Sequence, residues 1–308
     1  MGRRKKGRPV HGWVIIDKPK GMSSAQVVGK VRWLLDAQKA GHGGTLDPLA
    51  TGVLPIALGE ATKTVSFVMD GAKTYRCWVK FGTSTTTDDA EGETVETSEK
   101  RPTRAEIEAV LGEFQGDVEQ TPPVYSAIKI DGQRAYKRAR ADEIVEMPSR
   151  IVRIDRMVLV DMPSPDLAII DVDCGKGTYI RALARDLALR LGTVGHVADL
   201  RRTRSGPFTE QGAISLDSLE TLGHSARLED VVLPLKTALD DIPALALTDA
   251  EAGKLRQGQP ASATTVLSRT PDMKVSPGET VVVMQGETPV ALARIEGDEI
   301  RPIRVLNL

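Results

Sequence analysis

The sequence predicts an α+β fold in which helices flank a mixed, mostly antiparallel sheet. Segments with the 3.6-residue period of helices and segments with the two-residue period of strands follow one another without regular strand–helix–strand alternation. This order disfavours a parallel α/β sheet. The length of 308 residues, 41% of them hydrophobic, supports two domains. We therefore expect a main domain over residues 10–240 and a small β-rich domain over 243–308, after a short basic arm at 1–9.

The first elements are predicted from apolar runs and capping residues. Residues 13–17 form an apolar run that is typical of a strand and ends at a Lys-Pro pair. Ser23 or Ser24 then caps a helix with apolar residues at helical period, and 60–69 has the pattern of a second amphipathic helix. Between these helices, we interpret the glycine- and proline-rich stretch 41–55 as a loop.

The middle of the chain mixes strands and helices. Residues 75–81 alternate apolar and polar side chains, as a half-buried strand does. Thr103 and Glu106 have the spacing of a capping box, which predicts the start of a helix. The other expected elements are the strands 150–161, 168–174 and 196–203, the helix 178–191, and, in the C-terminal domain, the helix 247–257 with the strands 280–285 and 290–295.

Composition argues against a membrane or secreted protein. No apolar run approaches the ~18 residues that a membrane helix needs. The start, M-G-R-R-K-K-G-R-P, lacks the apolar stretch of a secretory signal. Two cysteines, far apart in the sequence, are too few for a disulfide framework. We therefore expect a cytoplasmic protein that has no membrane partner.

The net charge of −1 conceals a separation of charge along the chain. Residues 1–40 carry ten basic and two acidic residues, 176–204 carry seven and two, and 125–153 carry seven and four. Acidic residues concentrate elsewhere, with eleven against three basic residues in 82–122. Any one basic segment also fits an ordinary solvated surface. Three of them together are typical of a surface that binds a polyanion such as nucleic acid.

The stretch 41–55 reads G-H-G-G-T-L-D-P-L-A-T-G-V-L-P and carries one histidine and one carboxylate among four glycines. Pro48 keeps Asp47 out of the helical region and so restricts where its carboxylate points. Leu46 and Leu49 place apolar side chains around it. An aspartate held in this way is suited to nucleophilic or acid–base chemistry. The alternative is a tight turn in which the carboxylate only caps the following segment.

Five further strings, taken together with this stretch, form a set whose content and spacing are informative. They are D-K-P-K-G-M-S-S at 17–24, A-K-T-Y-R at 72–76, P-V-Y-S-A-I-K-I-D-G-Q-R-A-Y-K-R-A-R at 123–140, K-G-T-Y-I-R-A-L at 176–183 and L-R-R-T-R-S-G at 200–206. In content and spacing, the set resembles the tRNA pseudouridine synthase B (TruB) family over roughly two thirds of the chain, which makes it far more specific than one short motif.

The resemblance implies an enzyme that isomerises uridine to pseudouridine at position 55 of tRNA, in the T-loop, after the base leaves its stack. It implies that the T-arm stem-loop of tRNA is the partner and that the reaction uses no cofactor and no metal. We expect a monomer. The segment at about 123–150 is then an insertion that clamps the RNA, and the C-terminal domain is a PUA-like RNA-binding β-barrel.

The resemblance also assigns site residues. Asp47 matches the catalytic aspartate, and Arg181 matches an arginine that stays protonated and can hold both carboxylate oxygens. For Arg181 alone, the alternative is a surface position on its helix. Tyr75 covers the flipped uracil, and its phenol takes the proton from C5. The remaining substrate-binding residues that the resemblance implies are His42, Tyr179 and Leu200.

Two other functions stay open. A phosphotransferase with a D-x-D-x-T string also uses an aspartate nucleophile, but Asp47 is followed by Pro48 and Leu49, and no second acid for Mg²⁺ lies nearby in the sequence. The four histidines and two cysteines also lack zinc-site spacing. A non-catalytic protein that binds or folds tRNA would explain the basic segments as well. In that case Asp47 would be dispensable.

Overall fold

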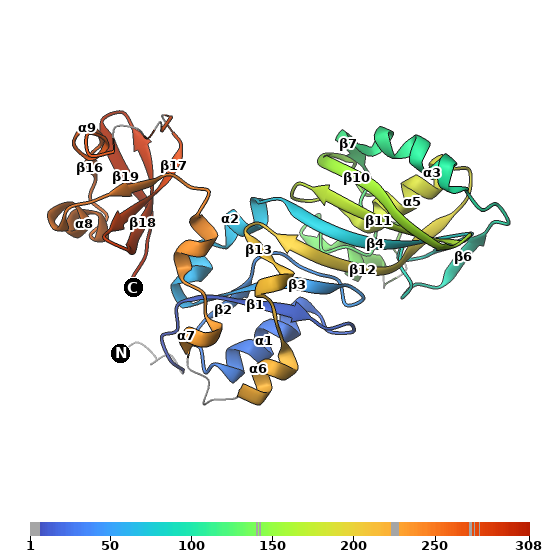
Figure 1. Cartoon of the computed structure of the whole chain (residues 1–308), viewed down its shortest axis with the longest axis horizontal. Helices are drawn as coiled ribbons and strands as arrows, with labels where there is room; N and C mark the ends of the chain where they lie inside the picture. The colour runs from blue at the N-terminus through green and yellow to red at the C-terminus, as the bar shows by residue number, and fades with distance from the viewer. Residues whose placement is uncertain are drawn as a thin grey trace.

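The computed structural model describes residues 7–308 apart from 140, 142, 223–227, 271–272, 274 and 277. In these residues a ten-stranded sheet forms the body of the molecule, in the order β14-β1-β3-β12-β4-β11-β10-β7, with β2 beside β3 and β13 beside β12 (Figure 1). Its strands are β1 (Gly12–Lys18), β2 (Ala40–His42), β3 (Thr51–Leu58), β4 (Lys73–Phe81), β7 (Gly116–Gln120), β10 (Arg150–Ser164), β11 (Leu167–Cys174), β12 (Gly195–Ser205), β13 (Phe208–Thr209) and β14 (Ile214–Ser215).

The pairing within this sheet is mostly antiparallel, as the sequence predicts. Among the described pairings, only β1–β14 and β3–β12 are parallel. The expected strands at 13–17, 75–81, 150–161, 168–174 and 196–203 correspond to β1, β4, β10, β11 and β12. The α+β fold class is therefore confirmed.

Helices α1, α3 and α5 each bury apolar side chains in the core of the molecule. Ser23 caps α1 (Ser24–Leu34) in a capping box with Gln26, and Thr103 does the same for α3 (Arg104–Val110). Along α5 (Ile180–Arg190) the buried side chains face the sheet, with most contacts to β12. No helix in the described part of the chain is both long and apolar enough to span a membrane.

The remaining helices are short. They are the 3₁₀ helices η1 (Gly59–Lys63), η2 (Leu111–Phe114), η3 (Glu210–Gly212) and η5 (Leu235–Leu239) and the α-helices α2 (Val65–Asp70), α4 (Ala135–Ala139), α6 (Leu216–Leu222), α7 (Leu228–Val231), α8 (Asp249–Arg256) and α9 (Ala263–Leu267). The expected single helix at 60–69 is wrong, because η1 and α2 are separated at Thr64. The Thr64 hydroxyl donates to the Ala61 carbonyl and satisfies the end of η1.

The expectation that 41–55 is a loop is wrong at both ends. Strand β2 includes Gly41 and His42, and β3 begins at Thr51, so the loop spans only 43–50. Pro55 lies inside β3, although proline is rare within a strand because it has no N–H to donate to the neighbouring strand. It fits because β12 pairs with β3 at 51–52 and β2 pairs at 56–58, so the missing N–H falls where the partner strand changes. Its carbonyl still accepts the Gly43 N–H.

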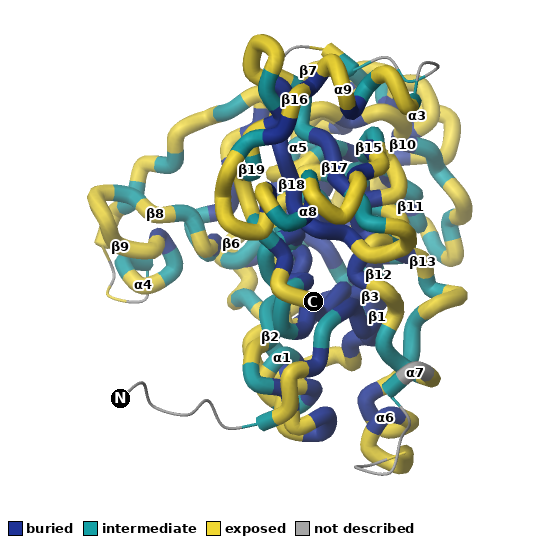
Figure 2. The backbone as a smooth tube through the Cα atoms, turned by 90° about the vertical axis from the view of Figure 1, so that its left-hand side faces the viewer, coloured by how far each residue is buried: buried dark blue, intermediate teal, exposed yellow. Residues whose placement is uncertain are grey.

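The projecting arm, residues 123–149, stands off the body of the molecule, where Figure 2 shows its hairpin and helix on one side. The hairpin consists of β8 (Lys129–Ile130) and β9 (Gln133–Arg134), followed by α4. Arg134 therefore lies at the end of a strand, directly before α4. Arg140, like residues 1–6 of the basic arm, lies outside the described residues.

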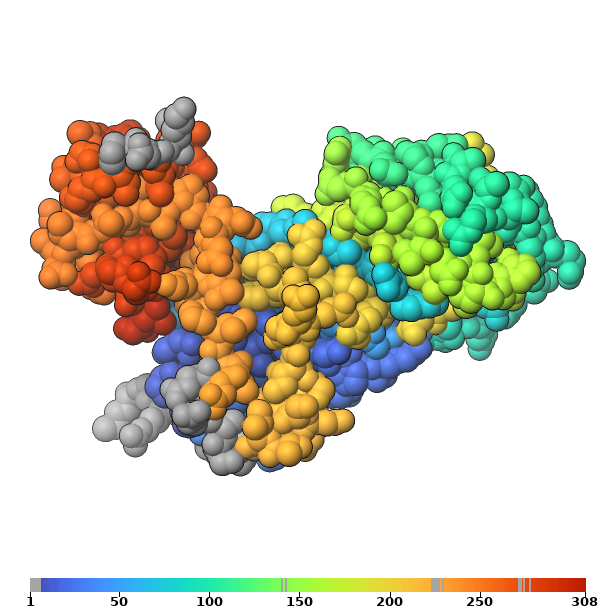
Figure 3. Space-filling model, in the orientation of Figure 1, coloured from blue at the N-terminus to red at the C-terminus, as the bar shows by residue number. Residues whose placement is uncertain are grey.

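A second sheet forms the C-terminal module, residues 243–308, at one end of the molecule (Figure 3). Its order is β15-β17-β18-β19-β16, and it curls into a half-barrel with its own apolar core, packed by α8 and α9. The strands are β15 (Ala244–Ala246), β16 (Ala261–Ser262), β17 (Thr280–Gln285), β18 (Thr288–Glu296) and β19 (Glu299–Val305). The sequence predicts β17 and β18 but not the other three.

A third apolar cluster joins this module to the main sheet. Trp13 of β1 and Phe208 of β13 belong to it, with ring centroids 5.3 Å apart, and so do Val282, Leu292 and Leu306 of the module. Polar contacts run alongside: Lys63 Nζ donates to the Val305 carbonyl at 2.7 Å, and the Asn307 N–H donates to Glu60 Oε2 at 2.9 Å. The joint is therefore an extension of the core rather than a loose linker.

Leu292→Ala tests whether this cluster couples the two sheets. Leu292 is 2% exposed, so truncation should lower the free energy of unfolding by about 2–5 kcal/mol. Chemical denaturation should still show one transition, because the other residues of the cluster keep the two sheets packed on each other until both unfold. Ile303→Ala, at a 40% exposed position of β19, should cost about 0.5 kcal/mol or less. Two separate transitions in the Leu292 variant would contradict the shared core.

Candidate active site

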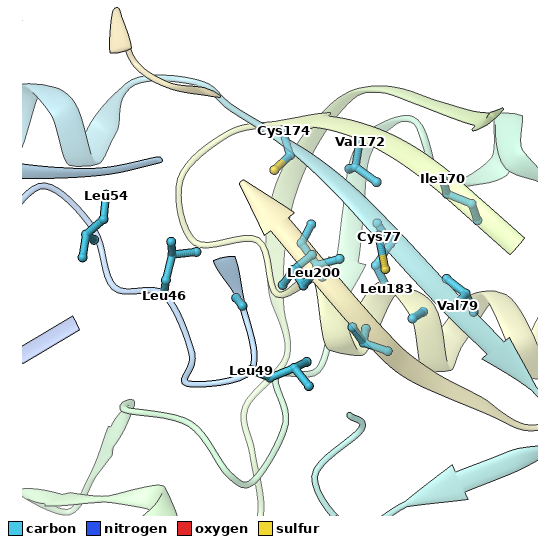
Figure 4. Packing of buried hydrophobic residues seen from close by; sticks show 14 of the residues in the cluster. Leu46, Leu49, Leu54, Cys77, Val79, Ile170, Val172, Cys174, Leu183 and Leu200 are labelled. Atoms are coloured by element: carbon cyan, nitrogen blue, oxygen red, sulfur yellow. The ribbon is translucent and has the colours of Figure 1, made fainter. Parts of the chain in front are cut away.

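The loop 43–50 that carries Asp47 is fixed from the side of α1. The buried Ser24 hydroxyl accepts the Leu46 N–H at 2.8 Å and donates to the Leu46 carbonyl at 2.9 Å. Leu46 and Leu49 are buried in the main core, in the same cluster as Leu200 of β12 (Figure 4). Asp47 therefore lies between two anchored leucines, as its apolar neighbours suggest.

Lys18 holds the other side of the turn. Its side chain is completely buried, and its ammonium donates to the carbonyls of Pro19 at 2.9 Å, Met22 at 2.6 Å and Pro48 at 3.2 Å. Burial lowers the pKa of Lys18 to about 8, while the negative charge of Asp47 acts in the opposite direction. The lysine thus links the end of β1 to the Pro48–Leu49 peptide, directly after Asp47.

Arg202 of β12 binds backbone carbonyls of the loop 43–50 and of β3. Its side chain is buried, and Nε donates to the Val53 carbonyl at 2.8 Å, Nη2 to Gly44 at 3.1 Å and Nη1 to Thr45 at 3.4 Å. At Gly52 the two strands approach so closely that a Cβ atom would lie 2.2 Å from the Arg202 carbonyl, at a φ of +96°. Only glycine allows this contact.

The Asp47 carboxylate faces Arg181. Arg181 Nε lies 3.0 Å from Asp47 Oδ2, but the Nε–H does not point along this contact, so it is an ion pair without a hydrogen bond. The Arg181 side chain is 5% exposed and that of Asp47 is 36% exposed. A surface role for Arg181 is therefore excluded, and the aspartate remains open to a ligand.

A second carboxylate shares the same arginine. Asp89 is 3% exposed, and its Oδ2 lies 3.3 Å from Arg181 Nη1. Its Oδ1 accepts the Thr87 hydroxyl at 2.5 Å and the Glu91 N–H at 3.0 Å. Arg181 also donates to the carbonyls of Thr87 at 2.7 Å and Tyr125 at 3.0 Å. Sequence reasoning missed Asp89, because it counted the residue only among the acids of 82–122.

Tyr75 and Leu200 lie on the neighbouring strands β4 and β12. Tyr75 is half-buried and pairs in register with Arg202, and Leu200 is buried opposite Cys77. Burial raises the pKa of the Tyr75 phenol, while the positive charge of Arg202 and a hydrogen bond with its side chain act in the opposite direction. The phenol is therefore neutral at physiological pH.

The other two expected residues flank this centre. His42 is half-buried at the end of β2, and in the part of the chain that the structure describes its Nδ1 has no hydrogen-bond partner. Burial, followed by the charge of Arg202, lowers the pKa of His42. Tyr179 is the N-cap residue of α5, and the Arg150 guanidinium lies 5.0 Å from the centre of its ring. Among the expected site residues, within the described part of the chain, Asp47 and Arg181 form an ion pair, and the positive charge of Arg202 acts on both His42 and Tyr75.

Within the part of the chain that the structure describes, no group of three or more His, Cys, Asp or Glu side chains could hold a metal ion. What the arrangement offers is one half-exposed carboxylate and one buried arginine beneath it. Tyr75, with its neutral phenol, and the buried Leu200 lie on the paired strands β4 and β12. Such a site can orient a carboxylate toward an aromatic, polar ligand.

Two family models together cover 32–240. Residues 32–180 match the TruB family pseudouridylate synthase (N terminal domain), and 181–240 match the tRNA pseudouridylate synthase B C-terminal domain. A curated relative from Rhodospirillum rubrum, tRNA pseudouridine synthase B, is 53% identical over 308 residues and covers 100% of both chains. The chain belongs to the TruB family. A TruB-family relative of the same name from Caulobacter vibrioides is 52% identical over 309 residues, again covering 100% of both.

Solved structures share the TruB-family fold at lower identity. A chain of a Cbf5-Nop10-Gar1 complex aligns with a TM-score of 0.75 at 24% identity, over 96% of this chain and 85% of its own. A chain of an H/ACA RNP bound to a substrate RNA containing 2'-deoxyuridine gives 0.74 at 22%, over 100% and 92%. At this identity the likeness concerns the fold alone.

Arg202→Met tests the support of the loop in this TruB-family chain. The substitution keeps the bulk of the side chain but leaves the carbonyls of Val53, Gly44 and Thr45 without their donor. Each lost bond costs about 1 kcal/mol and more where the acceptor stays dry, so the free energy of unfolding should fall by about 3–5 kcal/mol. Arg204→Met, on the same strand but half-exposed, is the control and should cost at most about 1 kcal/mol. Equal losses would show that Arg202 does not hold the loop.

His42→Gln tests the neutral histidine. The folded state holds the pKa of His42 below the value of about 6.5 that it has when unfolded. Below that pH the unfolded chain therefore binds the proton first, and stability falls as pH drops. The glutamine variant lacks this term, so it should lose less stability than the parent between pH 7.5 and 5. A difference between the two proteins that is the same at both pH values, measured by denaturation, would contradict the neutral state.

Proposed function

We propose that this chain isomerises uridine to pseudouridine in tRNA and that Asp47 is its catalytic carboxylate. The observation that carries the proposal is the pairing of a half-exposed Asp47 with a buried Arg181 in a chain of the TruB family. The relatives that match over the whole chain are named tRNA pseudouridine synthase B. The finer proposal is that the target is the uridine at position 55, in the T-loop.

The reaction breaks the C1′–N1 bond of uridine and forms a C1′–C5 bond within the same nucleotide. N1 gains a proton and C5 loses one, so the atoms balance without an oxidant, a reductant or a second substrate. The protein must bind the flipped base, hold the sugar and base while they are separated, and move one proton. A small-molecule cofactor has no step to supply in this scheme.

Asp47 is the group that we assign to the bond-breaking step. The Arg181 guanidinium lies against one of its oxygens and presents a fixed positive charge, which keeps the carboxylate in one orientation. The turn behind it is held by Ser24, Lys18 and Arg202, so little reorganisation is needed when the substrate arrives. A rigid, half-exposed carboxylate of this kind can attack the nucleotide directly.

The surrounding residues are proposed to hold the flipped uracil. Base flipping costs a few kcal/mol, which stacking and hydrogen bonds in the pocket must offset. Tyr75 is assigned to cover the base. Because a neutral phenol is too weak a base to hold a second proton, its oxygen is proposed to take the proton from C5 while its own proton is given up toward N1. Leu200 and Tyr179 are assigned to the pocket wall. His42, whose Nδ1 has no hydrogen-bond partner among the described residues, is proposed to hold the flipped conformation from the other side.

The RNA-binding surface is proposed to lie on the projecting arm and the C-terminal module. Lys129, Arg134 and Lys137 of the arm are at least partly exposed. In the C-terminal module, Arg301 and Arg304 of β19 are exposed. Lysine and arginine contacts to phosphates supply most of the affinity for RNA and make it dependent on salt. We propose that the T-arm stem-loop binds across these surfaces and that one cytoplasmic monomer suffices.

A minimal assay tests the function. The parent protein is incubated with an unmodified T-arm stem-loop, without added cofactor, and pseudouridine is measured at the position-55 equivalent. Product at that position supports the proposal. RNA binding without product would favour a tRNA-binding or tRNA-folding protein, and turnover that requires Mg²⁺ and a phosphoryl donor would favour a phosphotransferase.

Asp47→Asn identifies the carboxylate. The amide keeps the shape of the side chain but removes its charge, and the loop keeps its anchors. Turnover should fall by about 10⁴-fold or more. RNA affinity and melting temperature should stay near those of the parent, because Asp89 and two backbone carbonyls still surround Arg181. Asp70→Asn is the control, because Asp70 is an exposed partner of Lys176 at the end of α2 and should retain turnover. Substantial turnover in the Asp47 variant would place the chemistry elsewhere.

A further inference from the structure

Gln120, the last residue of β7, makes a contact that the proposed mechanism does not use. Its side chain is 1% exposed, and both ends of its amide bind the backbone of one residue. Nε2 donates to the Tyr179 carbonyl at 3.1 Å, and Oε1 accepts the Tyr179 N–H at 2.8 Å. Tyr179 is the N-cap of α5, whose own side chain makes no capping hydrogen bond. Gln120 therefore fixes the start of the helix that carries Arg181 two residues later.

Further contacts tie the start of α5 to the projecting arm and to the residues just before it, which follow Gln120 in the chain. Arg181 Nη2 donates to the Tyr125 carbonyl at 3.0 Å, and Arg185 Nη2 donates to the Thr121 carbonyl at 2.8 Å. On the returning side, the Thr121 and Ser149 hydroxyls are 2.8 Å apart. Both stems of the arm are thus fastened to each other, and the outgoing stem is fastened to the first two turns of α5.

We propose that Gln120 is a positioning residue, which holds Arg181 against Asp47 and couples this ion pair to the seating of the projecting arm. The inference rests on the proposed function of Asp47. An amide is suited to this task because it presents one donor and one acceptor to a backbone N–H and C=O at once. A displacement of the arm's outgoing stem would therefore reach Arg181 through the Gln120–Tyr179 pair and the Tyr125 carbonyl.

The geometry explains why a displacement here would affect turnover. The Arg181–Asp47 contact is a single approach of 3.0 Å without an aligned hydrogen bond, so nothing within the pair itself corrects a shift of the helix start. A misplacement of about 1 Å in a catalytic group can cost roughly a hundredfold in rate. Gln120 makes no contact with the loop 43–50 among the described hydrogen bonds, and so acts on Asp47 only through α5.

Gln120→Ala tests the proposal on the full-length protein. At saturating stem-loop RNA, kcat should fall by roughly tenfold to a hundredfold, with Kd for the RNA within about twofold of the parent value, since Gln120 is buried. Gln115→Ala is the matched control. Gln115 is an exposed glutamine near the start of the same strand, which donates weakly to the Met157 carbonyl at 3.5 Å. Its kcat should be that of the parent.

Gln120→Glu provides a readout that a purely structural residue would not move. The ionised carboxylate keeps the acceptor for the Tyr179 N–H but repels the Tyr179 carbonyl, whereas the protonated acid can donate to it as the amide does. The kcat of this variant relative to the parent should therefore recover as pH falls. A crystal structure of Gln120→Ala should also show Arg181 Nε farther than 3.0 Å from Asp47 Oδ2.

Parent-like kcat in Gln120→Ala, or a loss fully explained by a smaller folded fraction, overturns the proposal. So does a Gln120→Glu ratio that is flat with pH. The crystallographic distance is independent of activity, so it still decides the positioning role if the parent protein makes no pseudouridine. In that case an unchanged distance overturns the inference, and a lengthened one upholds the positioning of Arg181 while the proposed function fails.

Discussion

A buried arginine between two carboxylates is the constraint on which the rest of the site depends. Removing an ion from water costs several kcal/mol, so Arg181 can be buried only if its partners surround it. Asp47 comes from the loop after β2, Asp89 from the segment after β5 (Thr83–Thr85), and one carbonyl from the stem of the projecting arm. These separate segments are held together because each of them contacts the guanidinium of Arg181.

The elements that could be predicted from sequence are those whose signals are local. Capping residues at Ser23 and Thr103 precede α1 and α3, and strict alternation marks β4. The helix that carries Arg181 shows its buried stripe in the sequence itself. Asp47 stands out because proline, glycines and leucines surround it within a few residues, and the family pattern adds its partner.

The residues that sequence reasoning missed are defined by distant contacts. Arg202 and Val53 are 149 positions apart in the sequence, and Gln120 and Tyr179 are 59 apart. The residues that surround each of them in the sequence do not predict these contacts. Asp89 differs from its acidic neighbours only by being buried. The strand β3 was hidden for a similar reason, since Pro55 is tolerated there only because of where β12 ends and β2 begins. The geometry around Asp47 and Arg181 thus depends on polar residues whose local patterns are unremarkable.

The apolar cluster that joins the two sheets brings together the two ends of the chain, Trp13 and Leu306. A ribosome adds about 5–20 residues per second, so β1 waits on the order of tens of seconds before its last apolar partners are synthesised. During that interval the side of the cluster that the C-terminal module will cover faces water or a chaperone. Closing the cluster is therefore a late step of folding, and a nascent chain that stops short of residue 306 would leave the cluster without its last apolar member.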